Sequence, residues 1–239
     1  MFRALFATLV AAQVAYGRLP AERRVAATRA IMGLMLAAAV AESAQARGPR
    51  RGPALVALAG AVGFATELTG VATGRPFGHY SYGPALGARV GGVPLMVGVA
   101  WAMLARPAWV VAGWVSRVPV LRALVAAGAL TAWDVFLDPR MVREGYWTWA
   151  DGGAYEGVPL SNFAGWAATG AVVFALWAAL DPDDDPAAGD GALALYAWNW
   201  AGETFANAAL WGRPRVAAAG GVAMGAFAGP ALAARRRAT

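Results

Sequence analysis

The stretch GGVPLMVGVAWAMLARPAWVVAGW, residues 91–114, is among the clearest apolar runs in this chain. Its length and composition fit the roughly 20 apolar residues that a helix needs to cross a bilayer. Comparable runs occupy residues 1–16, 25–41, 53–72, 118–137, 158–180, 192–211 and 214–234. The sequence therefore predicts an all-α fold, a polytopic membrane bundle of about seven to eight transmembrane helices.

The composition agrees with a membrane protein. The chain has 239 residues, of which 59% are hydrophobic and 14% are charged, whereas soluble domains carry roughly 25% charged residues. Runs such as residues 123–132 are dense in Ala and Gly, which lets helices approach closely in lipid. We expect one membrane-embedded domain over residues 1–239, and a membrane segment rather than a cleaved signal peptide at residues 1–16, since no A-x-A-like site follows convincingly.

The residue types that are missing exclude several kinds of chemistry. The chain has no Cys and one His, His79, so it offers no thiolate nucleophile, cysteine-bound zinc, iron–sulfur cluster or multi-histidine metal site. We therefore predict no metal and no cofactor. The net charge is +6, but the arginines stand singly or in short clusters between apolar runs. They are read as loop anchors and predict no nucleic-acid partner.

Four acidic residues lie inside apolar segments: Glu67 in GFATELTG, Asp134 and Asp138 in TAWDVFLDP, and Glu203 in NWAGETFAN. An ionised side chain at the centre of a membrane helix costs about 2.5–3.5 kcal/mol on insertion scales, so each is a functional candidate.

Asp134 and Asp138 carry the strongest signal. Their i, i+4 spacing places both carboxyls on one helix face, and Pro139 predicts that the helix ends at Asp138, near one mouth of the bundle. Two close carboxyls in a poorly solvated site do not both ionise easily, so we expect one to keep its proton near neutral pH and act as a general acid. The structural alternative pairs each carboxylate with an arginine such as Arg122 or Arg140.

Glu67 and Glu203 are weaker candidates. Asn199, Glu203 and Asn207 share a helix face by the same spacing. Such a polar stripe either lines a wet cavity or forms hydrogen bonds between helices.

Two loops differ in character. Residues 181–191, DPDDDPAAGDG, are acidic and rich in Pro and Gly; we interpret them as a solvated linker, with cation chelation as the alternative. Residues 140–157 are rich in Tyr and Trp, which predicts an interfacial cap.

Five motifs in order resemble the membrane carotenoid hydratases of the CruF type, which include carotenoid 1,2-hydratases and bisanhydrobacterioruberin hydratases. The motifs are FGHYSYG (77–83), GVPLMVGVAWAM (92–103), TAWDVFLDPRMV (131–142), GYWTW (145–149) and YEGVPLSNFAGW (155–166). The resemblance implies addition of water to the terminal double bond of an acyclic C40 or C50 carotenoid, which gives a tertiary alcohol. It also implies a lipophilic substrate within the bilayer of a prokaryotic cell membrane, and association with other membrane enzymes of the carotenoid pathway.

The site roles follow from the chemistry of the residues. We expect Asp134 to be the general acid and Asp138 its partner, with Glu67 and Glu203 as second-tier catalytic candidates. Aromatic faces stabilise a cation. The substrate-binding candidates are His79, Tyr80, Tyr82, Trp133, Trp147, Trp149, Asn162 and Trp166. Of these, Asn162 would position water, and His79 is either a loop residue with a local hydrogen bond or a proton relay.

Two other functions remain open from the sequence. A membrane prenyltransferase would use the D-x-x-x-D spacing of Asp134 and Asp138 to hold Mg²⁺–diphosphate, with residues 181–186 as its second acidic motif. A non-catalytic carotenoid-binding protein would use the aromatic side chains without proton chemistry.

Overall fold

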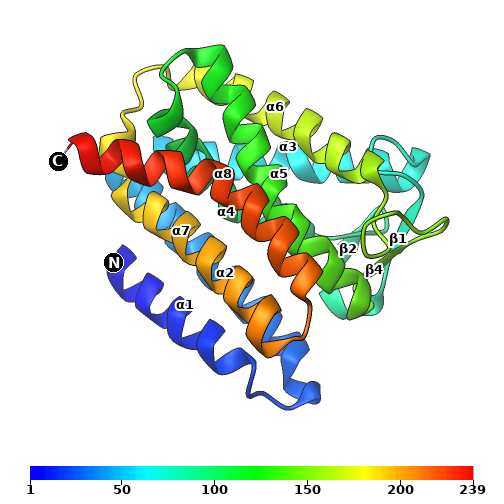
Figure 1. The fold of residues 1–239 in the computed structure, drawn as a ribbon. Coiled ribbons are helices and arrows are strands. Elements are labelled where there is room, and N and C mark those ends of the chain that lie inside the picture. The colour runs from blue at the N-terminus through cyan, green and yellow to red at the C-terminus, as the bar shows by residue number, and fades with distance from the viewer. Residues whose placement is uncertain (239) are drawn as a thin grey trace.

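The computed structural model describes residues 1–238 and forms a bundle of eight α-helices with two short β-ribbons at one end (Figure 1). The helices are α1 (Phe2–Tyr16), α2 (Ala21–Arg47), α3 (Arg51–Thr73), α4 (Leu95–Val115), α5 (Pro119–Arg143), α6 (Leu160–Leu180), α7 (Asp190–Phe205) and α8 (Pro214–Ala238). The strands are β1 (Tyr80–Tyr82), β2 (Arg89–Val90), β3 (Val93–Pro94) and β4 (Trp147–Trp149). The short turns are the 3₁₀-helices η1 (Pro84–Leu86) and η2 (Pro186–Gly189) and the π-helix η3 (Ala206–Leu210).

The all-α membrane bundle predicted from the apolar runs is confirmed. Each run became one helix, and six of the helices within residues 1–238 are long and apolar enough to cross a membrane. The two that are not among them are α1, with 15 residues, and α7, whose 16 residues continue into the π-helix η3. The chain is thus an integral membrane protein.

The core lies around α4, which packs against α2, α3, α5, α7 and α8. Small residues let the helix backbones approach one another. A Cβ added at Gly60 of α3 would lie 2.9 Å from the Gly98 carbonyl oxygen of α4, and one at Gly170 of α6 would lie 3.2 Å from Ala127 of α5. Ala127 belongs to the Ala/Gly-dense run of α5, so close packing through small residues is confirmed there.

The acidic segment between α6 and α7 is a structural element, and its interpretation as a solvated linker is wrong. Asp181 and Asp184 are buried. Asp181 accepts a hydrogen bond from Arg47. Asp184 forms ion pairs with the guanidinium groups of Arg106 at 2.9 Å and Arg122 at 2.6 Å. Burial alone would raise the pKa of Asp184, but the two guanidiniums hold it below its usual range. These arginines belong to α2, α4 and α5. The sequence around residues 181–191 therefore does not indicate the charges that neutralise the two aspartates.

We expect Asp184→Ala to destabilise the bundle by about 3–5 kcal/mol, because it leaves Arg122 buried without a counter-charge and Arg106 with Glu42 alone. Thermal unfolding of the purified protein in detergent measures the effect. Asp183→Ala is the matched control, since Asp183 is the neighbouring carboxylate and is exposed. Equal melting temperatures for the two variants would mean that the buried ion pairs contribute no net stability.

Helix α5 does not end at Asp138, contrary to the expectation drawn from Pro139. It continues to Arg143. A proline inside a helix leaves the carbonyl four residues earlier without its backbone donor, and here that carbonyl, of Val135, accepts a hydrogen bond from the Tyr155 hydroxyl at 3.1 Å. The Tyr155 hydroxyl replaces the missing backbone donor. Helix α5 therefore continues beyond Pro139, and Asp134 and Asp138 both lie within the helix rather than at its end.

Candidate active site

The aromatic loops meet in a two-stranded ribbon that covers the bundle end near Asp138. Strand β1 pairs antiparallel with β4, and Tyr80 lies opposite Trp149 and Tyr82 opposite Trp147. Side chains alternate along a strand, so these four rings share one face, whereas Ser81 and Thr148 are exposed on the other. The ring centroids of Tyr82 and Trp147 are 5.8 Å apart, and those of Tyr80 and Trp149 are 5.9 Å apart. The predicted cap is therefore a ribbon with one aromatic face.

The acid pair is buried beneath this ribbon. Asp134 is 0% exposed and Asp138 is 2% exposed, and the two carboxyls are within hydrogen-bonding reach of each other. The side-chain amide of Asn162, in the first turn of α6, donates to Asp134 Oδ2 at 2.9 Å and also to Asp138 Oδ2. The Trp147 indole donates to Asp138 Oδ1 at 3.0 Å. Asn162 thus joins the two carboxyls, and it also lines the small cavity described next, so its expected role in positioning water stays a prediction.

Glu67 of α3 is a third buried carboxyl of this site. Its Oε2 accepts hydrogen bonds from the hydroxyls of Tyr80 at 2.5 Å and Tyr82 at 2.7 Å, and its Oε1 accepts one from the Trp101 indole at 3.2 Å. Burial, and then the charge of Glu67, raises the pKa of both phenols. Tyr80 and Tyr82 therefore stay protonated and act as donors to Glu67.

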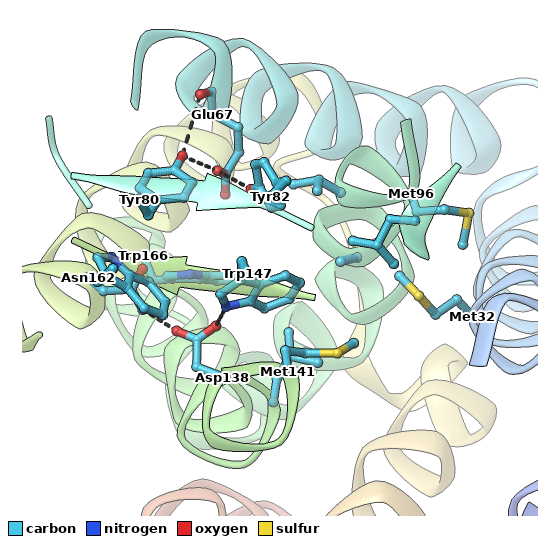
Figure 2. A pocket seen from close by; sticks show the side chains of 15 residues that line it. Met32, Glu67, Tyr80, Tyr82, Met96, Asp138, Met141, Trp147, Asn162 and Trp166 are labelled. Carbon is cyan, nitrogen blue, oxygen red and sulfur yellow. Dashed lines mark hydrogen bonds between the residues drawn. The ribbon is translucent and has the colours of Figure 1, made fainter. Parts of the chain in front are cut away.

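A small cavity separates the two acidic groups. Figure 2 shows Glu67 with Tyr80 and Tyr82 on one side of it and Asp138 with Trp147 on the other. Its volume is about 30 Å³, enough for one or two water molecules, which need about 10–15 Å³ of such space each. Asp138 lines the cavity, whereas Asp134 does not, and Asp134 Oδ1 has no hydrogen-bond partner within residues 1–238. The cavity can hold a water between two carboxyl groups.

Several contributors to this site were missed by the sequence analysis. Trp101 holds Glu67 and stacks on Trp166, with ring centroids 3.9 Å apart. Its place in the motif at residues 92–103 was the available signal. Met32, Met96 and Met141 form an apolar part of the cavity wall (Figure 2). Nothing in their spacing along the chain indicates this, because they belong to α2, α4 and α5.

The other sequence candidates lie in different places. Trp149 and Trp166 line the small cavity. Trp133 packs edge to face against Trp166, with ring centroids 6.2 Å apart. Trp133 does not line the small cavity but, with Glu203, lines a second and larger one. The side chain of His79 is exposed and lies against Gly74 at the end of α3, so the structure places it outside both cavities.

The polar stripe on α7 faces the larger cavity. Asn199 and Glu203 line it, and Asn207 donates to Glu203 Oε2 at 3.3 Å. Two of the three residues of this stripe therefore line a cavity, whereas Asn207 lies in η3 and contacts Glu203; that the cavity is wet stays a prediction.

The arginines suggested as partners of the acid pair bond elsewhere. Arg122 binds Asp184, and Arg140 donates to Glu144 at 3.1 Å. On α5, Arg122 lies twelve residues before Asp134, which corresponds to about 18 Å of helical rise. The acidic segment held by Arg122 is therefore far from the pair and cannot complete a Mg²⁺–diphosphate site with it. Within residues 1–238, no three His, Asp or Glu side chains converge closely enough to hold a metal ion.

Comparison with known proteins gives two matches. The model of a family described as carotenoid biosynthesis protein matches residues 6–227. A bisanhydrobacterioruberin hydratase of Haloarcula japonica is 34% identical over 133 residues, which cover 54% of this chain and 45% of that protein. The chain thus matches less than half the length of this relative. No solved structure matches the chain.

Proposed function

The chain belongs to the carotenoid biosynthesis protein family, and we propose that it is a hydratase that adds water to the terminal double bond of an acyclic carotenoid. The observation that carries this proposal is the water-sized cavity between Asp138 and Glu67. The similarity to a bisanhydrobacterioruberin hydratase supports the same reaction. The product would be a tertiary alcohol.

The first step of the proposed reaction is protonation of the alkene. Two adjoining buried carboxyls hold one proton more readily than two negative charges. Asp138 is assigned as the donor because it is the member of the pair that faces the cavity. This exchanges the roles expected from the sequence: Asp134 shares the proton and resupplies it, and Asn162 fixes both carboxyls in position.

The second step is capture of the cation by water. Protonation at the less substituted carbon places the positive charge on the tertiary carbon, where the faces of Trp147, Trp149 and Trp166 stabilise it. The cavity water attacks this carbon, and the oxonium ion that forms loses one proton to Glu67 on the opposite wall of the cavity. One proton is consumed and one is released, so the reaction needs no electrons and no cofactor.

The source of the added atoms tests the proposal. The purified protein, incubated anaerobically with an acyclic carotenoid in ¹⁸O-labelled water, should place ¹⁸O on the tertiary carbon, and in D₂O it should place deuterium on the adjacent carbon. Mass spectrometry of the product measures both labels.

Two results would contradict it. Label acquired in a parallel incubation in unlabelled water under ¹⁸O₂ would indicate an oxygenase. Unchanged pigment with wild-type protein that binds it would favour the non-catalytic carotenoid-binding function.

A further inference from the structure

A second cavity of about 540 Å³ lies beside the small one, between α1, α2, α5 and α7. The two cavities share three wall residues, Met32, Leu137 and Met141. Figure 1 shows α1 along the outer flank of the bundle beside α7, and Gln13, Val14 and Tyr16 of α1 line the large cavity. These three apolar side chains therefore lie between the large cavity and the small cavity that Asp138 lines.

The size of the small cavity requires such a neighbour. About 30 Å³ accommodates water but not a branched hydrocarbon end group as well. Methionine side chains are unbranched and adaptable, so rotation of Met32 and Met141 would join the two cavities. The end group could then reach Asp138 while the rest of its chain occupies the larger space.

The walls of the large cavity suit a hydrocarbon that enters from lipid. Its inner part contains Met35, Trp133 and Phe136. At its edge, Val14, Phe205 and Leu210 also line it, and their exposed fractions are 54%, 62% and 60%. These side chains belong to α1, α7 and η3. An apolar rim of this kind on a membrane protein faces acyl chains rather than water.

Two of the three charged side chains that line this cavity, Arg140 and Glu203, have partners within the protein. Arg140 donates to Glu144 and lies 4.5 Å from the Tyr16 ring centroid and 5.2 Å from that of Trp211. Glu203 accepts its hydrogen bond from Asn207 and faces the charge of Arg140. The third, Arg18, is exposed, so the buried charged side chains of the cavity leave no charge that a ligand must neutralise.

We propose that the large cavity binds the polyene chain of the substrate behind its reacting end, with Met32, Leu137 and Met141 as the partition through which that end reaches Asp138. This inference rests on the proposed hydratase function for the identity of the ligand. It assigns a binding site that opens to the lipid between α1 and the end of α7.

Filling the cavity tests the site. Gly202 of α7 lines it, and a Cβ there would meet no atom closer than 3.9 Å, so Gly202→Leu projects into open space. Gly33→Leu on α2 is the matched control, because its Cβ meets nothing within 4 Å and it lies outside both cavities. With lycopene as a model acyclic polyene, titrated into detergent-solubilised protein, Gly202→Leu should weaken binding at least tenfold and Gly33→Leu should not.

A second measurement holds even if Gly202→Leu does not fold. The natural chain has no cysteine, so Gly202→Cys and Gly33→Cys each introduce a single thiol. Lycopene should slow maleimide labelling of Gly202→Cys at least tenfold and leave labelling of Gly33→Cys unchanged. Wild-type affinity in Gly202→Leu, or an unprotected thiol in Gly202→Cys, would overturn the inference.

The outcomes separate the binding site from the reaction. If lycopene protects Gly202→Cys but the unmodified protein hydrates no acyclic carotenoid, the cavity inference stands and the hydratase proposal fails. If hydration proceeds without protection, the hydratase proposal stands and the polyene lies elsewhere.

Discussion

Asp138→Asn should lower the rate of hydration by about 10²–10⁴, the range attributed to general acid catalysis, because it removes the acidic proton that faces the cavity. The amide has nearly the same volume, and its oxygen can still accept the hydrogen bond of Trp147. The amide nitrogen takes the place of the oxygen that accepts from Asn162, so the melting temperature and carotenoid binding of the variant are measured beside its rate. Product formation by purified variants, measured by chromatography at saturating substrate, gives the rate.

The comparison with Asp134→Asn decides which carboxyl donates the proton. If Asp138 is the donor and Asp134 resupplies it, Asp134→Asn should lower the rate by a smaller factor, because a carboxyl still faces the cavity. Asp151→Asn, in the exposed loop after β4, is the control and should keep full activity. A larger loss in Asp134→Asn would restore the assignment made from the sequence. Near-normal rates in both variants would mean that Glu203 or Glu67 is the general acid.

Glu67→Gln should lower the rate by about 10² or more, because the captured water then has no carboxylate to receive its proton. The substitution also removes a hydrogen-bond acceptor. Tyr80, Tyr82 and Trp101 donate to the two carboxylate oxygens of Glu67, whereas the amide of glutamine has only one oxygen. A buried donor left without a partner costs about 1–3 kcal/mol, so a lower melting temperature is expected as well.

Deuterium distinguishes loss of this base from loss of the acid. In Glu67→Gln the cation should still form and, lacking efficient water capture, return to alkene by losing a proton. Unreacted or isomerised carotenoid recovered from D₂O should then carry deuterium, whereas carotenoid recovered from Asp138→Asn should carry none. Glu22→Gln, at an exposed position on α2, controls for the substitution itself. Unlabelled carotenoid together with a slow rate in Glu67→Gln would place Glu67 at the protonation step or in a purely structural role.

The sequence by itself determined the bundle. A hydrocarbon environment requires each backbone polar group to be bonded within its own segment, so an apolar run of sufficient length forms a helix wherever its neighbours lie. The i, i+4 spacing likewise placed Asp134 and Asp138 on one face, because that relation depends only on helical geometry. The Tyr and Trp content of residues 140–157 indicated the cap too, but not that its strand pairs with residues 80–82.

Only the tertiary structure decided which groups meet. Pro139 predicted a helix end, and the hydroxyl of Tyr155, sixteen residues later, supplied the missing donor. The acidic segment was predicted to be solvated, but arginines from α2, α4 and α5 surround its buried Asp184. Glu67 looked like a second-tier candidate, yet it faces Asp138 across a water-sized cavity. Each of these outcomes depends on a partner distant in the chain, and the energy of a buried polar group is set by that partner rather than by its sequence neighbours.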